Sequence, residues 1–554
     1  MMRRALCVLV LLLPLTAAAD RRVPDDAAIA SAHPLATEAG IEILGKGGNA
    51  FDAAVAVSAA LAVVEPYSSG IGGGGFWLLQ RADGFETFVD GREVAPAAAT
   101  ADMYLDEHGA PVPKRSLEGP LAAGIPGQPA ALAHIAAKYG RLTLAQNLAP
   151  AVRLAEDGFP VYERLRGGLR AKHLLMRRWP GAERVFLPDG GLPAVGTVLR
   201  QPDLAATLRA MAENGHEGFY AGPVAEQLVA GVRANGGIWT AADLESYRVR
   251  EREPLRAEYR GVSITTAPPP SAGGVALIEI LNVLSGFDLG ALDGAARKHL
   301  VVEAMRRAYR DRAEFLGDPD FVDVPVERLT HPYYAAGLRA AIHTDRAMPS
   351  VLLPGIQPAE AGTQTTHLSV LDGEGNRVAA TLSINFWFGS GFMPERTGVL
   401  LNNEMNDFSL KPGVPDGYQL VGADANAIAP GKRMVSSMTP TILESSEGLA
   451  ILGTPGGSRI ISMVLLGALA WMDGADAAEM AALPRYHHQY LPDRVSHETE
   501  ALSAGERNAL ESMGHELAAT EDGYGNMQVV TWDFASGEVA AASDPRGVGA
   551  GYVY

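Results

Sequence analysis

Residues 364–385 of this chain read QTTHLSVLDGEGNRVAATLSIN, and this stretch decides how the centre of the fold is built. Apolar and polar residues alternate on both sides of DGEGN, whose Asp, Gly and Asn residues are typical of a turn. The pattern predicts a β-hairpin. A three-residue loop at Gly373–Gly375 sets a register that places Thr365 opposite Ser383, with Asn385 on the same face one step further on. A loop one residue longer or shorter would change every one of these pairs.

The rest of the sequence mixes helical and strand-like segments, which predicts an α+β fold. Apolar periodicity and capping residues predict helices at Leu35–Leu44, Ala50–Val64, Ala130–Tyr139, Leu144–Asp157, Pro202–Asn214, Val275–Leu284 and Lys298–Phe315. The run Gly70–Gly75 lacks the Gly-Lys-Ser/Thr ending of a phosphate-binding loop, so we expect close backbone packing beside a site. Residues Met348–Gln364 have no hydrophobic period and predict an exposed linker.

Composition indicates a large folded protein that does not bind nucleic acid. The 554 residues correspond to two or three domains or to one large unit, and 47% of them are hydrophobic. The net charge of −18 argues against nucleic acid as a partner, because phosphate contacts need clustered Lys and Arg. The one basic stretch, Glu163–Arg178, is expected to be a solvated helix face.

The first 19 residues have the pattern of a secretory signal peptide. Arg3 and Arg4 precede an apolar run that is too short to span a bilayer, and an Ala-rich cleavage site ends at Ala19. The only cysteine, Cys7, lies inside this segment, so the mature chain would have no disulfide and no cysteine nucleophile. We expect a secreted protein, with the periplasm as its compartment and no membrane span after the signal is removed.

Several motifs in this order resemble one family. They are QTTHLSV at 364–370, DGREVAP at 90–96, LNNEMNDF at 401–408, SSMTPT at 436–441 and PGGSR at 455–459. Together they resemble the γ-glutamyltransferases, which are N-terminal-nucleophile hydrolases, and the resemblance extends from about His33 to Gly551-Tyr552. It implies the four-layer αββα sandwich of that superfamily.

An N-terminal threonine can serve as its own base. Its hydroxyl is a poor nucleophile, but its α-amine has a pKa near ~8, close to working pH. Thr365 would gain that amine only if the bond after Gln364 broke, and the resemblance implies that the Thr365 hydroxyl breaks it. The products would be a signal peptide (1–19), a large subunit (20–364) and a small subunit (365–554).

The resemblance also assigns the remaining site residues. Gly456 and Gly457 would form the oxyanion hole, and Tyr418 would belong to a lid loop within Pro412–Arg433. A γ-glutamyl group carries an α-carboxylate and an α-ammonium. Arg92, Ser436 and Ser437 would bind the carboxylate, because a guanidinium and two hydroxyls are donors. The residues expected at the ammonium and near the nucleophile are Glu404, Asp407, Asn385 and Ser383.

The expected reaction is acyl transfer from glutathione or another γ-glutamyl amide to water, an amino acid or a peptide. No cofactor is implied. His487 and His488 are adjacent and have no carboxylate at ligand spacing, so we expect no metal site there.

Two other functions fit parts of the sequence. The first is a β-lactam side-chain acylase, since cephalosporin acylases share this fold and nucleophile. A glutaryl side chain has no amine for Asp407 to bind, which disfavours this function. The second is a binding protein that never matures, which the intact nucleophile motif disfavours. A denaturing gel separates it from an enzyme, because self-cleavage gives two bands.

Overall fold

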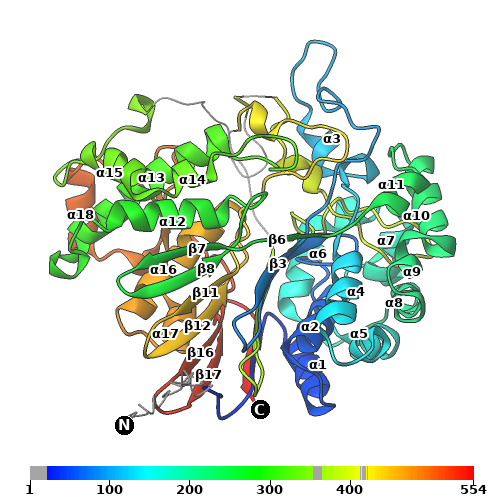
Figure 1. Ribbon diagram of the computed structural model, residues 1–554. Helices are drawn as coiled ribbons and strands as arrows, with labels where there is room; N and C mark the ends of the chain where they lie inside the picture. Colours follow the sequence, from blue (N-terminus) through cyan, green and yellow to red (C-terminus); the bar gives the residue numbers. More distant parts are fainter. Residues whose placement is uncertain (1–21, 354–364, 412, 415–419, 421) are drawn as a thin grey trace, which may run out of the picture.

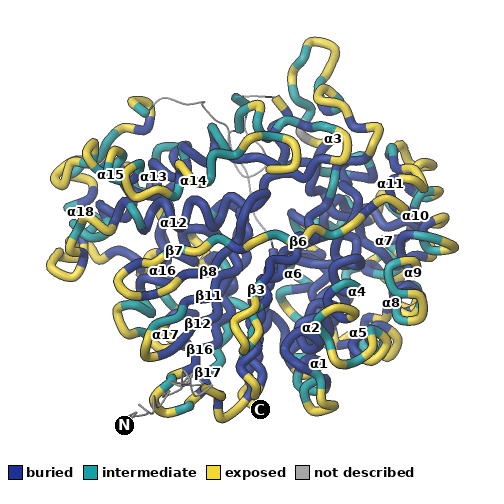
Figure 2. The backbone as a smooth tube through the Cα atoms, in the orientation of Figure 1, coloured by how far each residue is buried: buried dark blue, intermediate teal, exposed yellow. Residues whose placement is uncertain are grey.

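The computed structural model describes residues 22–353, 365–411, 413–414, 420 and 422–554. Two antiparallel sheets lie face to face, and each is covered by helices on its outer side (Figure 1). This is the four-layer αββα sandwich, which confirms the expected fold class. Figure 2 shows that the two sheets and the helices next to them form the buried interior of the molecule.

The first sheet has seven strands and contains the hairpin. Its order is β18 (Ala550–Val553), β1 (Ala28–Ser31), β9 (Thr366–Leu371), β10 (Arg377–Ser383), β2 (Gly74–Gln80), β3 (Glu86–Gly91) and β6 (Arg250–Arg252). Every neighbouring pair is antiparallel. The first strand of the chain therefore lies between its last strand and the strand that follows residue 365.

The second sheet has six strands and packs on the first. Its order is β17 (Val539–Ser543), β16 (Gln528–Asp533), β12 (Gly448–Gly453), β11 (Thr441–Glu444), β8 (Val262–Thr266) and β7 (Leu255–Tyr259). Two small sheets lie outside the sandwich, formed by β13 (Tyr486–His487), β14 (Val495–Glu498) and β15 (Leu517–Thr520) and by β4 (Phe159–Pro160) and β5 (Val198–Leu199).

The helices form two groups, one beside each sheet (Figure 1). Beside the first sheet are α1 (Pro34–Gly45), α2 (Ala50–Val64), α4 (Gln128–Tyr139), α5 (Leu144–Asp157), α6 (Glu163–Met176), α7 (Pro180–Phe186), α8 (Pro202–Asn214), α9 (Glu217–Tyr220), α10 (Gly222–Ala234) and α11 (Ala241–Ser246), with α3 (Pro113–Leu117) above them. Beside the second are α12 (Gly273–Leu284), α13 (Gly294–Phe315), α14 (Val326–Leu329), α15 (Pro332–Ala340), α16 (Ile460–Met472), α17 (Ala477–Ala482) and α18 (Ala504–Ser512).

Local sequence signals explain where these helices begin and end. The Asn49 side chain accepts hydrogen bonds from the backbone of Phe51 and Asp52 and so caps α2, whose residues are all buried. Thr143 and Gln146 form a capping box at the start of α5. No helix within the described ranges is both long and apolar enough to cross a bilayer.

The hairpin has the predicted register. Val370 pairs with Val378 and Thr366 with Leu382, so the next pair in the same register joins Thr365 and Ser383. The backbone N–H of Asp372 donates to the carbonyl of Asn376 at 2.9 Å, which closes the predicted three-residue loop.

The described part of the predicted linker is mostly exposed, at Pro349, Val351 and Leu352, and Ser350 is the exception. Residues Ser350–Leu352 form a short 3₁₀ turn, and Ser350 is fully buried. The backbone N–H of Ser350 donates to Asp493 at 2.6 Å, and that of Met348 donates to Glu303 at 3.2 Å. Sequence reasoning missed these contacts because both acceptors lie far away along the chain. Residues 354–364 lie outside the described residues.

Candidate functional site

Thr365 directly precedes β9, a strand in the interior of the first sheet. It is 4% exposed and lines a pocket together with Ser383 and Gly457. Side chains alternate along a strand, so Thr366 points to the opposite face. There its hydroxyl donates to the Glu65 carboxylate at 2.6 Å. Burial raises the pKa of Glu65 to about 7, although the hydrogen bond from Thr366 opposes the shift. The buried Glu65 carboxyl group therefore anchors Thr366, the residue next to the predicted nucleophile, on the opposite face of the strand.

The glycine run packs behind this pocket, as the sequence predicted. A Cβ at Gly72 would lie 2.1 Å from the carbonyl oxygen of Leu400, and one at Gly73 would lie 2.1 Å from that of Ser383. These positions need glycine because another backbone passes so close. Gly70–Gly75 thus brings the 383–385 and 400–402 segments together.

The predicted oxyanion hole lies in the turn between β12 and α16. Gly456 has a φ of 148° and Gly457 a φ of 55°, which are conformations that favour glycine. Gly457 lines the same pocket as Thr365, and Gly456 precedes it in the turn. Backbone N–H groups at such a turn can stabilise a developing negative charge.

Ser436 and Ser437 also line this pocket. The segment is fixed by backbone bonds to the turn before α12, since Ser436 N–H donates to Pro270 at 3.0 Å and its carbonyl accepts from Ala272 at 2.8 Å. The Ser436 hydroxyl oxygen accepts from the Met438 N–H at 3.1 Å. Its own proton is therefore available to an acceptor in the pocket.

Arg92 lies at the centre of the charged part of the pocket. Its Nη1 is 2.7 Å from the Glu404 carboxylate and its Nη2 is 2.5 Å from the Asp407 carboxylate. Asn385 donates to the other oxygen of Asp407 at 3.0 Å. Arg92 and Glu404 are each 1% exposed. The sequence assigned Arg92 and the two acids to opposite ends of a substrate, and the structure brings them into direct contact.

A third acid, Glu93, lies behind Arg92, with 3.6 Å between its carboxylate and Nη1. Burial raises the pKa of Glu93 to about 8, against the attraction of Arg92. Burial also raises the pKa of Glu404 well above its ordinary value, again against Arg92. Three carboxyl groups therefore surround one guanidinium, and burial disfavours the charged form of two of them, Glu93 and Glu404.

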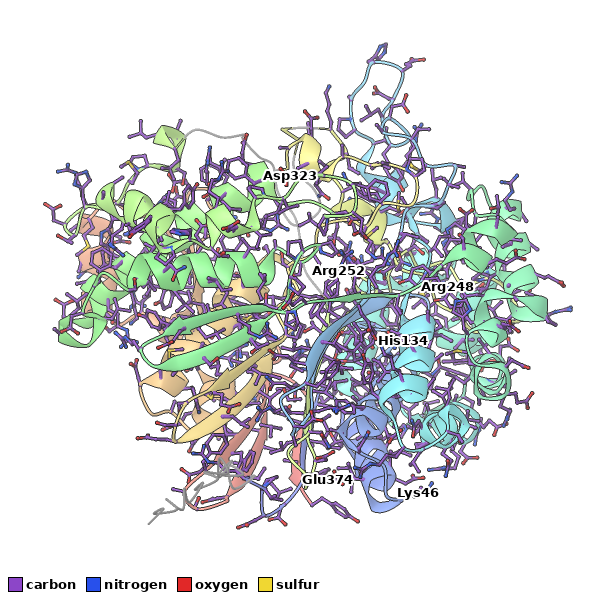
Figure 3. All side chains as sticks on the ribbon, viewed as in Figure 1. Lys46, His134, Arg248, Arg252, Asp323 and Glu374 are labelled. Atoms are coloured by element: carbon purple, nitrogen blue, oxygen red, sulfur yellow. The ribbon has the colours of Figure 1, made fainter. Side chains whose placement is uncertain are left out.

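Asp90 holds the backbone of Arg92 in place. Its carboxylate accepts from the Arg92 N–H at 3.0 Å and from Arg252 Nε at 2.8 Å. Arg252, labelled in Figure 3, also pairs with Asp320 at 2.9 Å. The bond between Arg252 and Asp90 connects β6 to β3 at the point where the DGREVAP motif enters the site.

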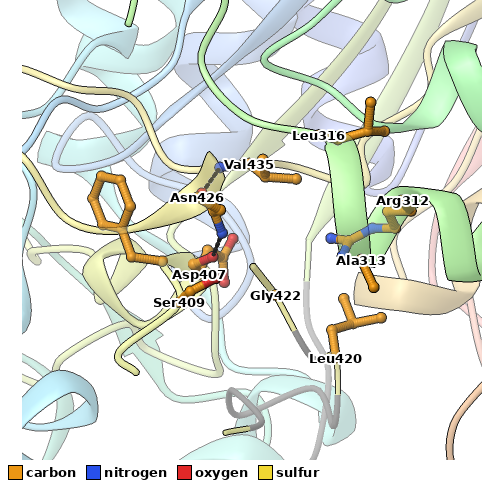
Figure 4. A pocket seen from close by; sticks show the side chains of 10 residues that line it. Arg312, Ala313, Leu316, Asp407, Ser409, Leu420, Gly422, Asn426 and Val435 are labelled. Atoms are coloured by element: carbon orange, nitrogen blue, oxygen red, sulfur yellow. Dashed lines mark hydrogen bonds between the residues drawn. The ribbon is translucent and has the colours of Figure 1, made fainter. Parts of the chain in front are cut away.

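A second, smaller pocket adjoins the first and shares Arg312, Asp407 and Leu420 with it. Figure 4 shows Arg312 on α13 across this pocket from Asp407, with Leu420 and Gly422 between them. Leu420 and Gly422 belong to the predicted lid segment. The predicted lid residue Tyr418 and the predicted cleavage residue Gln364 both lie outside the described residues.

The pocket thus brings together most of the predicted site. Of the predicted residues, it is lined by Arg92, Thr365, Ser383, Asn385, Glu404, Asp407, Ser436, Ser437 and Gly457. Arg312 was not predicted, although its helix was. The sequence gives no separate signal for Arg312, because the burial of the charged residues on α13 is seen only in the structure.

One cluster of potential metal ligands occurs among the described residues, at His299, Glu303 and His515. Arg306 and Arg307 already bind the Glu303 carboxylate, at 3.1 and 2.7 Å. A divalent cation would add buried charge without compensation, so the cluster is better explained as a buried polar network.

The adjacent histidines lie close to this network. No carboxylate stands at ligand spacing from them in the sequence, but the fold brings Asp493 to 3.2 Å from His488 Nε2. The chain reverses at Tyr490, which has a φ of 69°, and brings Asp493 back towards His488. His487 instead contacts Ser462 at 2.7 Å.

Comparison with known proteins identifies the family. The family model described as Gamma-glutamyltranspeptidase matches residues 36–554. The Glutathione hydrolase proenzyme of Pseudomonas sp. (strain A14) is 44% identical over 502 residues, which cover 89% of this chain and 87% of that protein. The Glutathione hydrolase proenzyme of Escherichia coli (strain K12) is 42% identical over 526 residues, which cover 94% and 90%.

Among solved structures, cephalosporin acylase from Bacillus halodurans is similar over its whole length. The TM-score is 0.84 at 30% sequence identity, with 99% of each chain covered. The fold that the two proteins share therefore includes both sheets and both helical layers.

Proposed function

Because this chain belongs to the γ-glutamyltranspeptidase family, we propose that it is an autoprocessed γ-glutamyltransferase and glutathione hydrolase. It cuts itself between Gln364 and Thr365. It then transfers the γ-glutamyl group of glutathione or a related amide to water, an amino acid or a peptide. The observation that carries this proposal is the single pocket that Thr365 shares with Gly457 and the charged set around Arg92.

Self-cleavage creates the catalytic group. The Thr365 hydroxyl attacks the carbonyl carbon of Gln364, and the bond to the Thr365 nitrogen breaks as that nitrogen takes up a proton. Water then hydrolyses the ester, leaving a carboxylate on Gln364 and a free hydroxyl on Thr365. The nitrogen of Thr365 is now an amine and can accept a proton, which an amide nitrogen cannot do.

Turnover uses the same hydroxyl. The α-amine takes the proton of the Thr365 hydroxyl as the oxygen attacks the γ-carbonyl of the donor, and the N–H groups of Gly456 and Gly457 stabilise the oxyanion. The ammonium returns the proton to the leaving amine, which leaves a γ-glutamyl ester on Thr365. Water or an amine acceptor then attacks this ester, again with the α-amine as base.

The charges around Arg92 suit a donor that carries both a negative α-carboxylate and a positive α-ammonium. The α-carboxylate of the donor replaces part of the contact that Arg92 makes with Asp407 and Glu404. The α-ammonium of the donor then binds Asp407 and Glu404. A zwitterion can make this exchange without leaving an unpaired buried charge, which is costly. Ser436 and Ser437 add hydroxyl donors for the carboxylate, and Asn385 holds Asp407 in position.

Variants of Thr365 test the proposal. Thr365→Ala should remain a single chain of precursor size on a denaturing gel. Thr365→Ser keeps a hydroxyl and should mature with reduced activity. Coexpression of 20–364 with 365–554 bypasses self-cleavage, and there the alanine variant should assemble and stay inactive towards γ-glutamyl anilide. An assembled alanine variant that works at the parent's rate would show that Thr365 is not the nucleophile.

Cephalosporin acylase activity is the second candidate, favoured by the whole-length structural similarity at a TM-score of 0.84. A glutaryl donor lacks the α-ammonium and would leave Asp407 and Glu404 paired only with Arg92. Relative kcat/KM for γ-glutamyl and glutaryl anilides, with and without glycylglycine as acceptor, distinguishes the two functions.

Export belongs to the same proposal. The pattern Arg3–Ala19 supports secretion to the periplasm, although these residues lie outside the described part of the chain. N-terminal sequencing of exported protein should begin at or near Asp20. A mature cytosolic chain that retains Met1 would contradict secretion.

A further inference from the structure

We propose that Arg312 is a positioning and specificity-determining residue for the α-carboxylate of the donor, and that it acts through the Ser437 hydroxyl. This inference rests on the function proposed above. Arg312 lies on α13, outside the motifs that identified the site, yet its side chain lines the pocket that contains Thr365. It is 9% exposed, and its Nη2 lies 3.2 Å from Ser437 Oγ.

The direction of this hydrogen bond fixes the role of Ser437. A guanidinium only donates, so Ser437 Oγ is the acceptor and its own proton must point elsewhere. The Ser437 carbonyl already accepts from the Thr439 hydroxyl at 2.9 Å. Ser436 is similar, because its Oγ accepts from the Met438 N–H. Each serine therefore receives a hydrogen bond from the protein and can donate one to an anion in the pocket.

The two serines differ in one respect. The partner of Ser436 is a neutral backbone N–H, whereas the partner of Ser437 is a cation. A charged donor polarises the hydroxyl and makes it a stronger donor in turn. Arg312 also adds positive charge to a site in which Arg92 is shared among acidic side chains. Both effects favour a carboxylate beside Ser437.

Helix α13 places Arg312 close to the turn that contains the predicted oxyanion hole. Tyr309 is three residues before Arg312 and so lies on the same face of the helix. Its hydroxyl donates to the carbonyl of Ser458, which directly follows the Gly456-Gly457 turn. One face of α13 thus contacts both the residue that follows the predicted oxyanion hole and the serine that is expected to bind the α-carboxylate.

Three small ligands separate the two charges of the donor. Glutamate has the carboxylate and the ammonium, 4-aminobutanoate lacks the α-carboxylate, and glutarate lacks the ammonium. We expect Arg312→Gln in the full, self-cleaved protein to weaken inhibition by glutamate and glutarate at least tenfold and that by 4-aminobutanoate less than twofold. KM for γ-glutamyl anilide should rise at least tenfold, with a smaller change in kcat.

A double-mutant cycle tests whether Arg312 acts through Ser437. In a Ser437→Ala background, Arg312→Gln should have less than a third of its effect in the parent. Arg312→Lys keeps the charge and should recover part of the glutamate affinity. Arg310→Gln is the matched control, because Arg310 is on the same helix but pairs with Asp311 at 2.6 Å. It should leave inhibition by all three ligands unchanged.

The outcomes distinguish this inference from the proposed function. A parent protein that does not cleave γ-glutamyl anilide would overturn the proposed function itself. An active parent whose Arg312→Gln variant weakens all three ligands equally, or none, overturns only the role of Arg312. Additive effects in the double mutant overturn action through Ser437. If Arg312→Gln fails to self-cleave, coexpression of 20–364 and 365–554 supplies the assembled variant, and Arg312→Lys is measured in the same way.

Discussion

At the scale of single residues, Arg92 has Glu404 and Asp407 as direct partners before any donor arrives. The two-pronged shape of its guanidinium allows it to hold one acid at each terminal nitrogen. A donor must exchange with these partners, so the geometry of Arg92 matters as much as its charge.

Arg92→Lys should therefore weaken donor binding while self-cleavage continues. An ammonium cannot reproduce the forked contact, and losing a charge-assisted bond costs about 1.5–3 kcal/mol. We expect kcat/KM for γ-glutamyl anilide to fall at least tenfold, with two bands still present on a denaturing gel. Arg250→Lys is the control, since that side chain is 61% exposed on β6. Parent-like kinetics in Arg92→Lys would show that Arg92 takes no part in binding.

Asp407→Asn should change the preference between donors. The amide keeps the shape but loses the charge that an α-ammonium needs. We expect kcat/KM to fall at least tenfold for γ-glutamyl anilide and by a clearly smaller factor for glutaryl anilide, which has no amine. Equal losses for the two donors would mean that Asp407 does not bind the ammonium.

At the scale of elements, the end of α2 is joined to the start of β9 by Glu65 and Thr366. The ordinary pKa of a glutamate is 4.5, and burial raises that of Glu65 to about 7. Between these values the folded protein binds a proton that the unfolded chain has released, so the free energy of unfolding falls as pH rises through this range. The total loss is about 3 kcal/mol.

Glu65→Gln should remove this pH dependence, because the amide does not titrate. The measurement is the urea midpoint between pH 5 and pH 8, with both proteins carrying Thr365→Ala so that each is one chain. The parent should lose stability relative to the variant as pH rises from 5 to 7 and change little above 7. Parallel pH profiles would show that Glu65 titrates normally.

The glycine run makes a prediction about packing. Gly72→Ala would place a Cβ 2.1 Å from the Leu400 carbonyl oxygen, and backbone at this position has little room to move. We expect a loss of about 1–3 kcal/mol in stability, measured by urea denaturation. Gly167→Ala in α6 is the control, since no atom lies within 4 Å of its new Cβ. That substitution should be neutral or stabilise by up to about 1 kcal/mol. Equal effects at the two positions would contradict the close approach.

Elements with local signals could be predicted from the sequence, and contacts between distant segments could not. The bounds of α2, α5 and α8 match the prediction, because caps and breaks are local. The hairpin register followed from its loop. The pairing of Arg92 with Glu404, the place of Arg312 and the burial of Ser350 depend on tertiary packing, which no local pattern records.

At the scale of the whole molecule, the two proposed subunits are interleaved in both sheets. In the first sheet, β1 precedes residue 365 and lies between β18 and β9, which both follow it. In the second sheet, β11 pairs with β8 from the earlier part of the chain. Separating the two pieces would break backbone hydrogen bonds in the middle of each sheet.

We therefore expect the cleaved pieces to stay together without any covalent link. Size-exclusion chromatography of the matured protein should give a single peak that contains both pieces, even after dilution to nanomolar concentration. Ala30→Pro should prevent stable assembly, because it disturbs a strand that pairs on both sides. Val23→Pro, at an exposed position outside any strand, should not. Separate peaks for the parent pieces would contradict this arrangement.

The position of β1 also determines what happens if the matured protein unfolds. Before the cut, refolding is a unimolecular process whose rate does not depend on concentration. After the cut, two chains must meet and thread β1 between β18 and β9, so refolding becomes bimolecular and fails in dilute solution. The matured enzyme would then persist only as long as it does not unfold, so its lifetime would be set by its unfolding rate rather than by an equilibrium. Self-cleavage would thus convert a protein that can refold after it unfolds into one that cannot reassemble in dilute solution.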